Sequence, residues 1–194
     1  MTTARRIGAE DSATRAALLD AAQALMTEEG YAAVTSRKVA ARAGLKPQLV
    51  HYYFRTMDDL FVALVRRGAD QTRARQEAAL VSDQPLWALW ELTTHPAGRT
   101  VITEVAALAN HRKALRTEIA ALARSLRDAQ IAGVTPILGR YGATTSLTPE
   151  AFVTLINAIG QNLLTEEALG LDTGHAAARA IVEDVLTRYE GPRR

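Results

Sequence analysis

Apolar residues recur every three or four positions along most of the chain, and this spacing is the feature that most restricts its fold. It places apolar side chains along one face of an α-helix. Leu18, Leu19, Ala22, Leu25 and Met26 show it first, and the same rhythm returns in later segments. No run of alternating apolar and polar residues is long enough to predict a strand. The 194 residues, 48% of them apolar, therefore predict an all-α fold of about nine helices with a buried core.

A short stretch from Val34 to Phe54, "VTSRKVAARAGLKPQLVHYYF", contains signals for two short helices. Thr35 can cap the start of the first, Gly44 can end it, and Pro47 is tolerated in the first turn of the second. Together with the preceding helix, the predicted helices cover about 12–29, 36–43 and 47–53. A helix followed by two short helices joined at a glycine forms a helix-turn-helix unit.

The same region is locally basic, although the net charge of the whole chain is only +2. No acidic residue occurs from position 30 to 57, whereas five cations do: Arg37, Lys38, Arg42, Lys46 and Arg55. The second short helix of such a unit can enter the DNA major groove with its N-terminal residues leading, and cations pair with phosphates. We therefore predict an N-terminal DNA-binding domain over 1–56. A larger helical domain over 57–194 follows and opens with a connector helix over about 57–79.

Three stretches carry a family resemblance: "ALLDAAQALMTEEGY", "VTSRKVAARAGL" and "LVHYYFRTMDDLFVAL". With their spacing, the segment from Thr14 to about Ala69 resembles the DNA-binding domain of TetR/AcrR-type transcriptional regulators. The rest of the chain is similar to this family only in length and helical character. The resemblance implies a sequence-specific regulator, most often a ligand-responsive repressor that binds a palindromic operator as a dimer.

The resemblance also implies a set of DNA contacts at the two short helices. By position, these are Thr35, Ser36, Arg37, Lys46, Pro47, Gln48, Leu49, His51, Tyr52 and Arg55. The amide of Gln48 can both donate to and accept from an adenine edge. Leu49 stands where the family often has a small hydroxyl residue. Met57 stands where the family commonly has a phosphate-binding lysine, so either one phosphate contact is lost or Arg55 replaces it.

The second half of the chain offers apolar helices for assembly. The predicted helices there cover about 85–94, 98–111, 114–131, 149–170 and 176–189, with breaks near Pro96 and Gly133. Two helices from each subunit could form a four-helix bundle. The alternative is that their apolar faces pack only inside one subunit. The candidate dimer residues are Phe152, Leu155, Ile156, Ile159, Leu163, Ile181, Val182, Val185 and Leu186.

The resemblance further implies an effector pocket within the C-terminal helices. The candidate residues are Trp87, Trp90, His95, Glu104, Leu108, His111, Asn157 and Gln161. Asn157 and Gln161 lie four positions apart and share a helix face, which could meet either the effector or the dimer partner. For the two tryptophans, ordinary core packing is the alternative. Pockets of this kind are largely apolar, so we expect a small, largely apolar effector.

Other classes of protein find little support in the residues. The absence of cysteine excludes disulfides and thiolate metal sites. The four histidines show no metal-binding spacing, and neither a nucleophile elbow nor a phosphate-binding loop occurs, so we expect no enzyme and no cofactor. With no apolar run of roughly 20 residues and no signal peptide, we expect a cytoplasmic protein. A non-specific DNA-binding or protein-interaction module remains the alternative function, although only three lysines occur.

Overall fold

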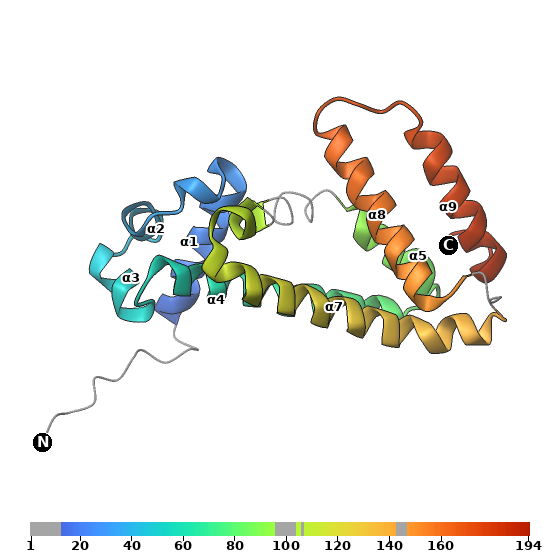
Figure 1. The fold of residues 1–194 in the computed structure, drawn as a ribbon, viewed down its shortest axis with the longest axis horizontal. Coiled ribbons are helices and arrows are strands. Elements are labelled where there is room, and N and C mark those ends of the chain that lie inside the picture. The colour runs from blue at the N-terminus through green and yellow to red at the C-terminus, as the bar shows by residue number, and fades with distance from the viewer. Residues whose placement is uncertain (1–12, 96–103, 106, 143–146) are drawn as a thin grey trace, which may run out of the picture. The chain divides into compact units, whose positions relative to one another are not determined.

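The structure is a computed structural model that describes residues 13–95, 104–105, 107–142 and 147–194 (Figure 1). Every regular element in these residues is a helix, so the all-α prediction with about nine helices is confirmed. The elements are α1 (Ala13–Glu29), η1 (Tyr31–Ala33), α2 (Ser36–Arg42), α3 (Pro47–Tyr53), α4 (Met57–Leu80), α5 (Pro85–Thr94), α7 (Lys113–Arg140), α8 (Pro149–Glu167) and α9 (His175–Glu190). Residues 104–105 and 107–111 are also helical. Within the described ranges, no helix has the length and apolarity needed to cross a bilayer.

The chain divides into two compact units. The N-terminal unit comprises Met1–Gly68 and Val101–Ala121, and the C-terminal unit comprises Ala69–Thr100 and Leu122–Arg194. Helices α4 and α7 contribute residues to both. The boundary predicted between residues 56 and 57 divides a DNA-binding domain from a ligand-binding and dimerisation domain. That functional division stays a prediction.

The core of the N-terminal unit comes from the residues that showed helical spacing. Helices α1, α2, α3 and α4 and the segment 104–121 all contribute to it. Its largest buried side chains are Leu18, Leu19, Leu25, Met26, Val39, Val50, Phe54, Leu60, Phe61, Leu64, Leu108 and Leu115. Because one face of each short helix is buried in this core, the opposite faces of α2 and α3 are left for solvent or a partner.

Local signals set the joint between α2 and α3. The Thr35 hydroxyl accepts a hydrogen bond from the backbone N–H of Lys38 at 3.3 Å and caps α2, as predicted. Gly44 adopts a φ of +67°, which strains any residue with a Cβ. Pro47 occupies the first turn of α3, as predicted. The helix-turn-helix geometry therefore follows from residues that act within one turn of each other.

The core of the C-terminal unit lies among α5, α7, α8 and α9. Its buried side chains include Leu86, Trp87, Leu89, Trp90, Val134, Ile137, Leu138, Phe152, Val153, Ile156, Leu163, Val182 and Leu186. A carboxylate from the last helix closes this core at the start of α5. The side chain of Glu190 accepts hydrogen bonds from the backbone N–H groups of Leu86 and Trp87 at 3.0–3.1 Å.

The predicted helix break near Gly133 was wrong. Helix α7 continues through Gly133 and Pro136 to Arg140. Burial of Val134 and of the two residues that follow Pro136 favours the helix, and it outweighs the loss of one backbone hydrogen bond at the proline. Gly133 also lets Leu80 of α4 approach, because a Cβ there would lie 2.3 Å from a Leu80 methyl. The helix predicted over 98–111 begins outside the described residues.

Candidate nucleic-acid interface

Helix α3 exposes its N-terminal residues and buries the residues that anchor it. Lys46, Pro47 and Gln48 are exposed, and Leu49 is half-buried. Val50 is buried in the core of the N-terminal unit. The polar amide of Gln48 is therefore presented on the outer side of α3, where the edge of a base can reach it.

The residues at the start of α2 also lie largely at the surface. Thr35 and Arg37 are exposed, and Ser36 is half-buried. The Thr35 hydroxyl oxygen accepts the hydrogen bond that caps α2. The same hydroxyl can still donate its hydrogen to a phosphate. Of these three predicted contacts, Arg37 presents the only charge.

The five cations of this region divide into two groups. Lys38 pairs with Glu29 at 2.6 Å. Arg42 makes two hydrogen bonds to Glu28, at 2.5 and 2.7 Å. The spacing of the sequence did not reveal these pairs, because both acids come from the end of α1.

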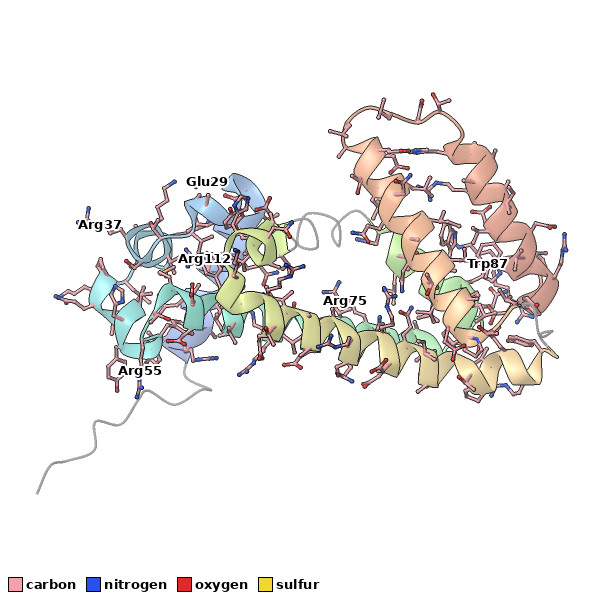
Figure 2. All side chains as sticks on the ribbon, viewed as in Figure 1. Glu29, Arg37, Arg55, Arg75, Trp87 and Arg112 are labelled. Atoms are coloured by element: carbon pink, nitrogen blue, oxygen red, sulfur yellow. The ribbon has the colours of Figure 1, made fainter. Side chains whose placement is uncertain are left out.

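Among the described residues, Arg37, Lys46 and Arg55 form no such pair with a carboxylate. Figure 2 shows Arg37 and Arg55 extending outward from the N-terminal unit. They flank α3 along the chain, since Arg37 precedes it on α2 and Arg55 follows its last residue. Three cations without a carboxylate partner among the described residues therefore lie on α2, at the start of α3 and just after α3.

The aromatic end of α3 combines exposed and packed rings. His51 and Tyr52 are exposed, as phosphate contact requires. Tyr53 packs against the core, with its ring at a right angle to that of Tyr52 and 5.1 Å between centroids. Met57 also packs against the core, and its thioether carries no charge that could bind a phosphate.

A reciprocal cap begins α4 directly after this surface. The Thr56 hydroxyl accepts from the Asp59 N–H at 3.1 Å, and the Asp59 carboxylate accepts from the Thr56 N–H at 3.0 Å. This is a capping box, a signal that the sequence analysis missed. It determines where α4 starts, and it leaves Arg55 exposed in the turn before it.

Comparison with known proteins agrees with this geometry. Residues 18–64 match the family model described as bacterial regulatory proteins, tetR family. This segment is a helix-turn-helix domain of the TetR family. The helix-turn-helix prediction is thereby confirmed, and the expectation that the protein is no enzyme agrees with a family of regulators.

Individual known proteins resemble the chain over different lengths. The HTH-type transcriptional regulator BetI of Rhizobium meliloti (strain 1021) is 30% identical over 129 residues, which cover 62% of this chain and 64% of that protein. A TetR transcription regulator from Haloarcula marismortui ATCC 43049 has the same fold, with a TM-score of 0.71 at 18% identity over 91% of this chain and 97% of that one. The structure of the multidrug binding protein EbrR, solved with imidazole, has a TM-score of 0.61 at 25% identity. It covers 95% of this chain and 97% of that one.

The residues predicted for an effector pocket lie in both units of the chain. Trp87 and Trp90 are buried in the core of the C-terminal unit, where the Trp87 indole donates to the Gly191 carbonyl at 3.1 Å. Leu108 belongs to the core of the N-terminal unit. His95 is exposed. The pocket stays a prediction, because no described cavity joins these residues.

Two other residues predicted for the pocket contact Tyr31 at the start of η1. Glu104 accepts a hydrogen bond from the backbone N–H of Tyr31 at 2.6 Å. The ring of His111 stacks on the Tyr31 ring, with 5.8 Å between centroids. Both side chains thus support the helix-turn-helix unit from a segment about 80 residues further along the chain.

The two amides predicted on one face of α8 differ in their surroundings. The Asn157 amide donates to the Gln130 side chain of α7 at 2.9 Å, and Gln130 is buried. Gln161 is exposed. Asn157 therefore faces α7 within the C-terminal unit, whereas Gln161 is accessible. Within the described residues, no three His, Asp or Glu side chains are grouped closely enough to hold a metal ion.

The residues predicted for the dimer interface also divide by burial. Phe152, Ile156, Leu163, Val182 and Leu186 are buried in the core of their own unit. Leu155 is 52% exposed and Ile181 is 68% exposed, while Ile159 and Val185 are half-buried. A groove beside Ile159 runs between α8 and α9 and is lined mainly by Ala158, Asn162, His175 and Ala178.

Proposed function

We propose that the protein is a sequence-specific DNA-binding transcriptional regulator that acts in the cytoplasm. The observation that carries this proposal is the exposed amide of Gln48 at the head of α3, next to the unpaired Lys46. A glutamine amide can bond both the N6 and N7 positions of adenine. A surface evolved only for phosphates would need cations alone.

The cations around α3 supply the affinity that such reading needs. Arg37, Lys46 and Arg55 are exposed, and each can neutralise one phosphate. Contacts to phosphates place the helix in the groove but carry no sequence information. In this proposal they set the register of α3, and Gln48 and Leu49 then read the base edges.

We propose that the regulator acts as a homodimer on a palindromic operator. A single seven-residue recognition helix reads few base pairs, and a second copy doubles the site. The exposed Leu155 and Ile181, together with the half-buried Ile159 and Val185, offer an apolar surface on α8 and α9. Covering it with the same surface of a second copy gives the two-fold arrangement that a palindrome requires.

We further propose that the protein is a repressor and that a small, largely apolar effector releases it from DNA. The solved relative EbrR is a multidrug binding protein, and this supports an effector for the present chain. An effector shifts the balance between two conformations only by its differential affinity for them. Tight binding without any change in operator affinity would therefore contradict this part of the proposal.

The decisive experiment selects genomic DNA fragments with the purified protein near 0.15 M salt, with competitor DNA, and sequences what is retained. A recovered palindrome with half-sites one helical turn apart supports the proposal. Binding without an enriched motif, but with a steep salt dependence, would instead identify the non-specific module.

Assembly is tested separately on the same protein. Replacing Ile181 by Glu places a charge in the proposed interface, and we expect analytical ultracentrifugation to show a monomer that binds the palindrome weakly. Glu183→Lys, at an exposed neighbour on α9, changes charge as a matched control. A dimer that survives Ile181→Glu unchanged excludes this surface.

A further inference from the structure

Two carboxylates at the end of α1 neutralise two cations of α2. Glu29 pairs with Lys38 at 2.6 Å and Glu28 with Arg42 at 2.5 Å. Lys38 and Arg42 are four positions apart and therefore occupy one face of α2. This face lies one residue from Arg37, which is proposed to meet DNA. Both cations keep more than a third of their side-chain surface exposed, so they would be accessible to a phosphate if released.

The position of Glu28 and Glu29 is not one that helix stability favours. The C-terminal end of a helix carries a partial negative charge, so carboxylates in the last turn of α1 are unfavourable there. Exposed ion pairs such as these contribute little to stability. The packing of α1 on α2 is already provided by buried side chains, among them Val39 and Ala40. The main effect of the two glutamates is therefore on the charge of the surface.

We infer that Glu28 and Glu29 are specificity-determining residues, which restrict phosphate binding by occupying Lys38 and Arg42. This inference rests on the proposed DNA-binding function. Non-specific affinity, which is the affinity for DNA irrespective of its sequence, comes almost wholly from phosphate contacts. With two of the five cations paired, that general affinity is reduced. The contacts of α3 with base edges then provide a larger share of the total binding energy.

The test measures binding of full-length protein to the selected operator and to an unrelated duplex of equal length, at 50 and 200 mM salt. In the variant Glu28→Gln/Glu29→Gln, we expect tighter binding to the unrelated duplex and a lower preference for the operator. Two additional phosphate contacts at a slope of about 0.9 each would make the loss of affinity between the two salt concentrations up to about tenfold larger.

Three matched variants separate pairing from net charge. Glu77→Gln/Glu183→Gln removes the same charge at exposed glutamates that have no ion-pair partner among the described residues, and we expect the wild-type salt dependence. Lys38→Gln/Arg42→Gln should also keep it, because those cations are already occupied. Adding Lys38→Gln/Arg42→Gln to the Glu28/Glu29 variant should restore wild-type behaviour.

The inference is overturned if Glu28→Gln/Glu29→Gln keeps the wild-type salt dependence on the unrelated duplex. It is also overturned if the Glu77/Glu183 variant changes that dependence by as much. Failure of the proposed function gives a different result, in which the wild-type protein shows no preference for any sequence. Circular dichroism at the assay temperature confirms that each variant is folded.

Discussion

The carboxylate of Glu104 accepts a 2.6 Å hydrogen bond from the backbone N–H of Tyr31, which lies 73 residues earlier in the chain. The bond forms where α1 has ended at Gly30, whose φ of +82° turns the chain away from the helix. A carboxylate oxygen of Glu104 is also 3.5 Å from the point where a Cβ would stand on Gly30. Glu104 thus provides a hydrogen-bond acceptor for the Tyr31 N–H, which has no acceptor within a helix at this turn.

Glu104→Ala is expected to lower the free energy of unfolding by about 1–3 kcal/mol, because it leaves the partly buried Tyr31 N–H without its acceptor. Glu104→Gln keeps an oxygen that can accept the bond, so its loss should be smaller. Urea denaturation followed by circular dichroism measures both. Equal midpoints for wild type and Glu104→Ala would show that this hydrogen bond is not needed.

Glu190→Ala is expected to destabilise the C-terminal unit by about 2 kcal/mol. The substitution removes the acceptor for two backbone N–H groups at the start of α5, where a negative charge also suits the helix dipole. Tryptophan fluorescence reports the change directly, since Trp87 carries one of these N–H groups. Glu183→Ala, at an exposed position of the same helix, should stay within about 0.5 kcal/mol of wild type. Similar losses in both variants would contradict the assigned role.

Gly160→Ala is expected to destabilise the protein by about 1–3 kcal/mol through overpacking. A Cβ on Gly160 would lie 2.6 Å from the Thr93 hydroxyl and 2.8 Å from the Thr93 carbonyl oxygen. Because one of these atoms belongs to the backbone of α5, a side-chain rotation cannot relieve the contact. Gly139→Ala in α7 meets nothing within 4 Å and should stabilise by about 0.5–1 kcal/mol. Thermal unfolding of the two variants should therefore shift in opposite directions.

Stability should fall in alkaline solution through Tyr141. Burial, and then the Glu190 carboxylate that accepts its hydroxyl hydrogen bond at 3.1 Å, raise the pKa of Tyr141 above its ordinary value of 10.0. The folded state therefore holds this proton more tightly than the unfolded state does. The resulting stabilisation is complete below pH 10 and is lost as the pH rises through the raised pKa. In Tyr141→Phe, denaturation midpoints measured from pH 8 to 11.5 should decline less steeply; the same decline as in wild type would exclude this cause.

Gln48→Ala is expected to reduce discrimination at one adenine position by about 1–3 kcal/mol while leaving affinity for unrelated DNA nearly unchanged. Arg55→Gln should weaken operator and unrelated DNA alike and lower the salt slope by about 0.9. Competition assays with operators that differ at single base pairs distinguish the two patterns. A uniform loss of affinity in Gln48→Ala would mean that this amide binds the backbone rather than a base.

Much of the DNA-binding unit could be predicted because its signals are local. The Thr35 cap, the turn at Gly44 and the first-turn position of Pro47 each depend on neighbours within about four residues. The error at Gly133 has the opposite origin. Glycine and a nearby proline usually end a helix, but burial of Val134 and close packing against Leu80 depend on distant parts of the chain.

The sequence by itself determined the all-α fold and the helix-turn-helix unit, since helical spacing, caps and turns are encoded over a few residues. Only the tertiary structure decided which cations remain unpaired, because the partners of Lys38 and Arg42 come from another helix. It also placed Trp87 in a core and Glu104 against Tyr31. Burial and ion pairing join residues far apart in the chain, and spacing along a sequence carries no record of which of them meet.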